Sequence, residues 1–298
     1  MTSPKLMRNL ASLSLFLVLT LSACGVPGGL NLVPATLTPT PSPTPTATPI
    51  PLAVSVNGEG ITVPEFEAEL ARYQQAQTAL GNTVSLEAAT KTVSDEFIDI
   101  LLLAQGAAAK GYRVDDAGLQ SRIVSLAAQV GGPDALSAWQ TAHGYTDASF
   151  RSDLRRQMAA AAMRDQIGAS IPSTAEQVHV KQILLYNAED AQQARGYLKS
   201  GRNFNDLAAQ YDPVTKGELG WLPRGYLSDP VIEAAVFALQ PGQYSDSIQT
   251  QAGHDILFVV AREPARPLSP DALLTLQERA LQDWLTQRRN ESTILLAH

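Results

Sequence analysis

The sequence has almost no cysteine: Cys24 is the single one among 298 residues, so no disulfide can form within the chain. It also lacks an excess of basic residues, since its formal net charge is −7 at pH 7. Proteins that bind nucleic acid need a basic surface to neutralise phosphates, so we predict no nucleic-acid partner. Apart from the N-terminal residues, no run is long and apolar enough to span a bilayer. The length predicts about two globular domains.

Residues 1–23 have the three parts of a secretory signal. Lys5 and Arg8 form the positive region, and an apolar core follows at Leu10–Leu21. The segment Leu-Ser-Ala-Cys that ends at Cys24 resembles the bacterial lipobox, in which the cysteine is diacylated and becomes the first mature residue. This resemblance predicts an extracytoplasmic protein that is lipid-anchored to the cell membrane. The alternative is an ordinary signal peptide in which Cys24 is incidental.

Residues 24–52 are predicted to form a tether between the lipidated cysteine and the folded part of the chain. Pro34–Pro51 alternates Thr and Pro with almost nothing that could pack. Such composition favours polyproline II, which gives this segment a reach of roughly 50–60 Å. A disordered segment without a spacer role is the alternative.

Residues 53–172 are predicted to form a helical domain. Two short β-prone runs flank a turn at Asn57-Gly58, and Thr62 begins a capping box with Glu65. Beyond them, apolar spacing and helix-end residues predict helices over 62–80, 86–110, 115–130, 133–143 and 146–167. The Ala- and Met-rich face at Met158–Met163 is either core or an adaptable binding surface, and we favour core.

A series of short motifs occurs in order within residues 176–262. Val178–Leu185 is predicted to be a strand, and helices are predicted over 188–200 and 204–211. Gly217–Leu257 then contains a predicted GELGW turn, a short helix ending in AVFAL, an L-x-x-G-x-x-S turn, and TQAGHDIL in place of T-x-x-G-x-H-I-I. This order resembles the parvulin (PpiC or rotamase) family of peptidyl-prolyl isomerases. The resemblance implies a parvulin-like domain over 173–264, a small antiparallel sheet wrapped by helices in an order close to βαααββ.

The flanking segments resemble a second feature of secreted foldases. A V-N-G-x-x-I-T entry followed by several helices resembles the N-terminal domain of foldase lipoproteins of the PrsA and SurA kind, whose helices form a cradle for unfolded chains. In these foldases a C-terminal helix packs on the N-terminal helices. Here the C-terminal segment 265–298 contains an amphipathic helix, predicted from Ser269 to about Leu295, with Arg262–Pro267 as the connector. The resemblance implies an α+β protein in which the parvulin-like domain is inserted into a helical chaperone-like domain.

The reaction that this family performs is rotation about X–Pro bonds. The barrier is near 20 kcal/mol because amide resonance must be broken. An enzyme needs an apolar slot for the proline ring and a polar site around the twisted amide. Since no nucleophile, metal or cofactor is required, we predict none.

The resemblance carries the family's site onto particular positions. Two facing histidines of the family fall on Gln182 and Asp255, and its Cys or Asp position falls near Asp212. The four positions implied for the substrate pocket are Leu222, Leu227, Ile232 and Phe237. A hydrogen bond between Gln182 and Asp255 is expected to replace the histidine pair.

The nearby histidines are predicted not to substitute for the missing pair. His179 lies three positions from Gln182, and His254 is adjacent to Asp255. Because successive side chains of a strand face opposite sides, both histidines should face away from the site unless a bulge intervenes.

Together these features predict a membrane-anchored extracytoplasmic foldase. It would isomerise X–Pro bonds in unfolded or exported polypeptides that contain proline, with catalysis weakened by loss of both family histidines. The alternative is a non-catalytic holdase or assembly chaperone, in which a degenerate parvulin domain only binds peptides.

Overall fold

The computed structural model describes residues 51–297, so the predicted signal, Cys24 and nearly all of the tether lie outside the described residues. Within this range, no helix has both the length and the apolar character that a bilayer crossing requires. The chain folds into a helical domain and a domain built on a four-stranded sheet, which are described in turn.

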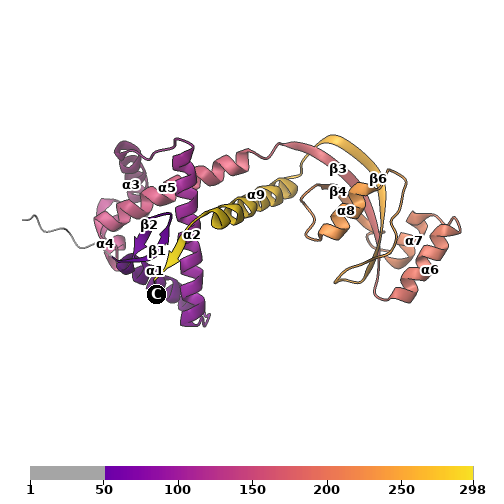
Figure 1. Cartoon of the computed structure of the whole chain (residues 1–298), viewed down its shortest axis with the longest axis horizontal. Helices are drawn as coiled ribbons and strands as arrows, with labels where there is room; N and C mark the ends of the chain where they lie inside the picture. Colours follow the sequence, from indigo (N-terminus) through magenta and orange to yellow (C-terminus); the bar gives the residue numbers. More distant parts are fainter. Residues whose placement is uncertain (1–50, 298) are drawn as a thin grey trace, which may run out of the picture. The chain divides into compact units, whose positions relative to one another are not determined.

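The helical domain combines a small sheet with helices from both ends of the described chain (Figure 1). Its antiparallel sheet has the order β2-β1-β7, formed by Glu59–Thr62, Leu52–Val56 and Ile294–Leu296. The helices are α1 (Val63–Ala79), α2 (Leu86–Ala109), α3 (Asp116–Val130), α4 (Pro133–Ala142), α5 (Asp147–Ala169) and α9 (Pro270–Glu291).

The entry to this domain follows local sequence signals. Asn57 and Gly58 have positive φ angles of 54° and 87°, the conformation that a tight β1–β2 hairpin turn requires. Thr62 caps α1 by accepting from the Glu65 amide, and the Glu65 carboxylate accepts from the Thr62 amide at 2.9 Å. The predicted turn and capping box are therefore confirmed.

Helix α9 packs back onto the N-terminal helices, as predicted. Trp284 joins the core beneath the small sheet to the core between α2 and α5. Gly106 of α2 lies against the Trp284 ring, where an added Cβ would come within 2.7 Å of the ring. Arg289 donates to both Asp95 and Asp99 of α2. On the facing side, α5 buries Ala160 and Met163, so these residues of the Ala- and Met-rich face belong to the core.

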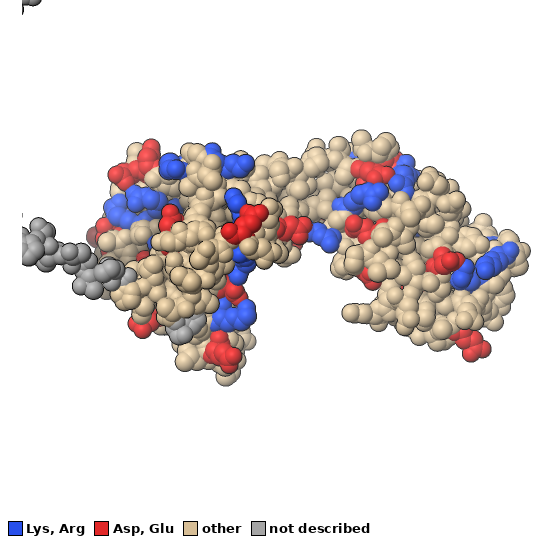
Figure 2. All heavy atoms as spheres, in the orientation of Figure 1, with Lys and Arg blue, Asp and Glu red and all other residues tan. Residues whose placement is uncertain are grey.

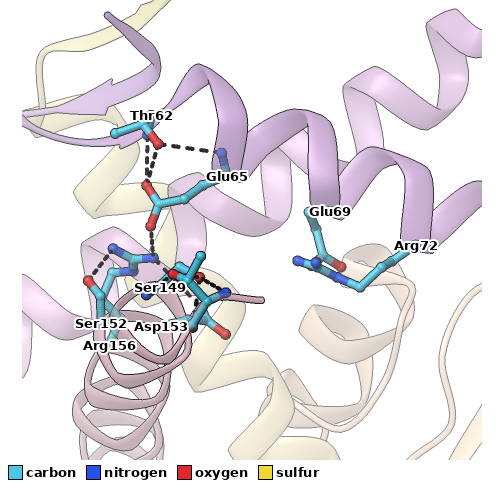
Figure 3. Close-up of polar contacts among 9 residues, drawn as sticks. Thr62, Glu65, Glu69, Arg72, Ser149, Ser152, Asp153 and Arg156 are labelled. Carbon is cyan, nitrogen blue, oxygen red and sulfur yellow. Dashed lines mark hydrogen bonds and ion pairs between the residues drawn. The ribbon is translucent and has the colours of Figure 1, made fainter. Parts of the chain in front are cut away.

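Polar side chains of α1 and α5 point toward one another across a hollow of about 580 Å³ (Figure 3). Glu65 accepts from Arg156 at 3.1 Å, and Arg72 pairs with Glu69 while donating to the His143 carbonyl at 2.8 Å. Asp153 lies in the same wall, where burial raises the pKa of its carboxyl. The Glu65–Arg156 pair therefore joins α1 to α5, and the Arg72–His143 bond joins α1 to the end of α4.

The second domain contains a four-stranded antiparallel sheet of order β4-β3-β6-β5. Its elements are β3 (Thr174–Leu185), α6 (Ala188–Lys199), α7 (Phe204–Tyr211), β4 (Glu218–Pro223), α8 (Pro230–Ala238), β5 (Ile248–Gln249) and β6 (His254–Pro267). Helices α6 and α7 cover one face through Ile183, Leu185 and Ile256. Helix α8 covers the other face, against Val180 and Leu257.

Several predicted boundaries were wrong, and strand pairing explains each difference. Strand β3 begins at Thr174, because it continues to pair with β6 as far as Thr174 opposite Pro267. Arg262–Pro267 therefore extends β6 and is not a connector. The GELGW segment, predicted as a turn, enters β4. Helix α9 ends at Glu291, before β7 pairs with β1.

Candidate active site

A hollow of about 730 Å³ opens on the face of the large sheet that α8 covers. It brings together Gln182, Asp255, Leu227 and Ile232, four of the residues predicted from the sequence. Its other lining residues are Leu219, Ser228, Asp229, Pro230, Thr250, Gln251, Ala252 and Leu257. Its volume and mixture of apolar and polar walls are typical of a ligand pocket.

Strand register places the polar pair on one face. Gln182 is the partner of Leu257, and Leu184 is the partner of Asp255, so Gln182 and Asp255 are diagonal neighbours on β3 and β6. Gln182 Nε2 donates to Asp255 Oδ1, the hydrogen bond expected from the sequence. Thr250 Oγ1 donates to Asp255 Oδ2 at 2.9 Å. Asp255 is only 3% exposed, and these two donors satisfy both of its oxygens.

Both nearby histidines face away from this pair, as predicted. His254 pairs with Leu185, whose side chain lies in the core under α6 and α7. His179 contacts Glu218 at 2.5 Å and stacks on Trp221. Bulges occur near His179, but the extra residue lies on β4 in one case and on β6 in the other. Strand β3 itself keeps its alternation, so His179 and Gln182 face opposite sides.

The apolar positions divide into pocket wall and core. Leu227, in the segment before α8, and Ile232, in its first turn, are half-buried and line the hollow. Leu222 and Phe237 do not line it, since both are buried in the core that includes Val180. Phe237 is further covered by the Arg224 guanidinium, 4.0 Å from its ring centroid.

Asp212 lies at the end of α7 and lines a separate hollow of about 340 Å³. Its Oδ1 accepts from the amides of Val214 and Thr215, each at 3.0 Å. The Thr215 hydroxyl also donates to Asp212, and this bond lowers the pKa of the carboxyl. Gln182 and Leu219 line both hollows, so Asp212 and Asp255 lie in adjoining hollows and not in one.

Two glycines of the quoted motifs hold the strands that carry the polar pair. At Gly217, with φ of 71°, an added Cβ would lie 2.1 Å from the Gln182 carbonyl oxygen. The Gln182 amide donates to the Gly217 carbonyl at 2.7 Å. At Gly253, an added Cβ would lie 2.4 Å from the Leu185 carbonyl oxygen. A side chain at either position would displace β3 from its neighbours.

Three of the lining residues that were not predicted from the sequence can be recognised there in retrospect. Thr250 is the threonine of the T-x-x-G motif, three residues before Gly253. Leu257 follows Asp255 by two positions, so strand alternation places it on the same face. Leu219 lies inside GELGW, where the bulge in β4 makes its direction hard to read from alternation.

This arrangement suits a peptide segment with an apolar ring. Leu227, Ile232 and Leu257 offer an apolar wall beside the Gln182 amide. That amide uses one N–H for Asp255 and keeps a second N–H for a ligand acceptor. The site can therefore hold a ring and donate to a neighbouring amide group.

Comparison with known proteins finds two family models that match successive parts of the chain. A family model described as SurA-like N-terminal domain matches residues 30–164, and one described as PPIC-type PPIase domain matches residues 181–261. Foldase protein PrsA of Bacillus subtilis is 25% identical over 191 residues, covering 60% of this chain and 61% of that protein. Foldase protein PrsA 2 of Listeria monocytogenes is 31% identical over 160 residues, covering 49% of this chain and 54% of that protein.

Among solved structures, a peptidylprolyl isomerase (PrsA) from Bacillus cereus is 19% identical. The structural alignment covers 81% of this chain and 86% of the Bacillus cereus chain, with a TM-score of 0.44. The alignments with the two foldases span less than two thirds of their lengths.

Proposed function

Because this chain is a PrsA/SurA-like foldase, with a SurA-like N-terminal domain and a PPIC-type PPIase domain, we propose that it isomerises X–Pro bonds in exported polypeptides. The observation that carries the proposal is the hydrogen-bonded Gln182–Asp255 pair beside the apolar wall of Leu227 and Ile232. On the family resemblance, we assign the pair to the positions where the parvulin family has its histidines.

In the proposed reaction, the proline ring packs against Leu227, Ile232 and Leu257. The free N–H of Gln182 faces the amide that precedes the proline and donates to its nitrogen as that nitrogen becomes pyramidal. Such a donor stabilises the twisted amide more than the planar one, which is how a site lowers a rotation barrier. No covalent bond is made or broken.

Catalysis is proposed to be weaker than in parvulins with two histidines. Asp255 is buried and both of its oxygens are already occupied, so it positions Gln182 and does not itself donate. One neutral donor therefore acts alone. Removing a single such donor from a catalytic site commonly costs about a hundredfold in rate, so a reduced but measurable activity is expected.

A second candidate is a holdase that binds unfolded chains without isomerising them. It is favoured by the SurA-like helical domain together with replacement of both family histidines. A protease-coupled assay with proline tetrapeptides separates the two functions when it is run beside suppression of client aggregation. Suppression without any acceleration at micromolar protein would support the holdase and exclude the isomerase.

The variant Asp255→His tests the origin of the weakness. A histidine there restores a group that can both accept from Gln182 and donate, so we expect kcat/KM to rise several-fold. Asp246→His, on an exposed part of the same domain, serves as the matched control and should leave the rate unchanged. A fall in rate with Asp255→His would contradict the view that the present pair is a weakened one.

We further propose that the chain is extracytoplasmic and anchored through a lipidated Cys24. The support is the Leu-Ser-Ala-Cys segment after an apolar core, and the absence of any other cysteine. Two acyl chains would hold the protein on a membrane stably. Cys24→Ser should release the protein from the membrane fraction or leave its signal uncleaved, whereas unchanged fractionation and processing would contradict lipidation.

A further inference from the structure

The hollow that contains Gln182 and Asp255, here called the prolyl hollow, adjoins the second hollow beside Asp212. Gln182 and Leu219 line both hollows, so the two share part of their wall and are together called the track. The first is about 730 Å³ and the second about 340 Å³. The second hollow is therefore about half the volume of the first and has room for a long side chain.

Every charged side chain that lines either hollow is an aspartate. Asp229 and Asp255 line the prolyl hollow, and Asp212 lines the second hollow. Lys216 lies in the loop after Asp212, but it is exposed and lines neither. A peptide in this track thus meets carboxylates with no lining cation to balance them, which favours positive and disfavours negative side chains.

The second hollow also offers aromatic surface. Tyr186 is 83% exposed at its rim, and Tyr211 is half-buried in its wall. The Asp212 carboxylate is partly exposed, and its bonds to Val214 and Thr215 fix it in place. Tyrosine faces beside a fixed carboxylate are the groups that bind lysine and arginine side chains.

The direction of the peptide follows from the chemistry of the X–Pro bond. The carbonyl next to the rotating bond belongs to the residue before proline. In the proposed binding mode, Gln182 donates to the amide before the ring, so the residue before proline lies beside Gln182. Because Gln182 also lines the second hollow, the side chain of that residue can extend toward Asp212.

We propose that the second hollow selects the residue before proline, taking lysine or arginine between Asp212 and the two tyrosines and disfavouring acidic or phosphorylated residues. This inference rests on the proposed function, because it assumes that proline occupies the adjoining hollow. It makes Asp212 a specificity-determining residue and gives it a different role from that of the Gln182–Asp255 pair.

The test uses the whole protein and three tetrapeptides that differ only in Lys, Gln or Glu before proline. Isomerisation rates are measured by the coupled assay, and affinities by fluorescence anisotropy of labelled peptides. We expect kcat/KM and affinity to be about fivefold higher for the Lys peptide than for the Glu peptide at low salt, with Gln between them. The Lys-to-Glu ratio should shrink as salt is raised.

The variant Asp212→Asn keeps an oxygen for the bonds to Val214 and Thr215 but removes the charge. It should reduce the Lys-to-Glu ratio to about twofold or less. Asp206→Asn is the matched control, because Asp206 is exposed on α7 and lines neither hollow, so the ratio should stay at its wild-type value.

Equal rates and affinities for the three peptides would overturn this inference while leaving isomerisation in place. An unchanged Lys-to-Glu ratio in Asp212→Asn would show that Asp212 does not determine this preference. If no peptide is isomerised, the proposed function fails, and the anisotropy ratio still decides whether the track prefers cationic side chains.

Discussion

At position 255 a carboxylate is buried in the wall of the candidate site, and the surrounding donors show how the fold tolerates it. Gln182 and Thr250 satisfy both oxygens of a side chain that is 3% exposed. A buried carboxylate without such donors would destabilise the domain by several kcal/mol. The two residues therefore suit one another, since a glutamine amide can donate to an aspartate where a second carboxylate could not.

Some of the site could be predicted from the sequence because its signals are local. The family resemblance paired Gln182 with Asp255, and strand alternation then predicted that both histidines face away from that pair. The assignment of Leu222 and Phe237 to the pocket is not supported by their position, because whether a side chain lines a hollow or the core behind it depends on how α8 packs on the sheet. That packing is a long-range property which residue spacing does not encode.

Asp153 in α5 carries a residue-scale prediction about pH. Burial raises the pKa of its carboxyl, and neighbouring Glu69 raises it further, while Arg156 and Arg72 lower it. The folded state thus holds this proton more tightly than the unfolded chain does. The stability it contributes is present below the ordinary aspartate pKa of about 4 and is lost as pH rises through the raised value.

Asp153→Asn has no carboxyl to ionise, so the variant should not lose this stability as pH rises. We expect the variant to gain about 0.5–1 kcal/mol in free energy of unfolding relative to wild type as pH rises from about 4 to 7. Denaturant unfolding at several pH values measures the difference. Asp165→Asn, on an exposed position of the same helix, should show no such trend. A difference for Asp153→Asn that stays constant with pH would contradict the account.

At the scale of elements, helices were easier to predict than strands. Each predicted helix exists within a few residues, because capping residues and apolar spacing lie inside the element itself. Strands β4 and β7 and the ends of β3 and β6 were missed because their partners are distant in sequence. Ile294–Leu296 becomes a strand only through β1, more than two hundred residues away.

Strand β7 gives a prediction at this scale. The Asn57 amide donates to the Thr293 carbonyl at 2.9 Å, and the Ala297 amide donates to the Ala53 carbonyl at 3.0 Å. A chain that ends at Ser292 loses these bonds and the burial of Ile294, so its helical domain should lose about 1–3 kcal/mol of stability. Thermal unfolding measured by circular dichroism would show this as a lower midpoint.

The control for the truncation is Leu295→Gln. Leu295 is 62% exposed, and this substitution keeps the backbone pairing, so the midpoint should change little. An unchanged midpoint in the truncated chain would show that β7 does not stabilise the helical domain.

At the scale of the molecule, the order of the domains could be predicted because the motifs follow one another along the chain. The discontinuous helical domain follows from this order, since α9 comes after the PPIC-type domain and packs on α2 and α5. Figure 2 shows basic and acidic side chains interspersed on the visible face, with most of that face uncharged.

The central claim is that the hollow beside Gln182 and Asp255 isomerises X–Pro bonds, and the protease-coupled rate of wild type against Leu227→Ala tests it most directly. Leu227 lines the hollow and is only half-buried, so its truncation should spare the fold while removing the wall for the proline ring. Leu274→Ala, at an exposed position on α9, is the matched control. We predict acceleration by wild type at micromolar protein and a loss of about tenfold in kcat/KM for Leu227→Ala alone. No acceleration by wild type, or equal rates for wild type and Leu227→Ala, would contradict the account.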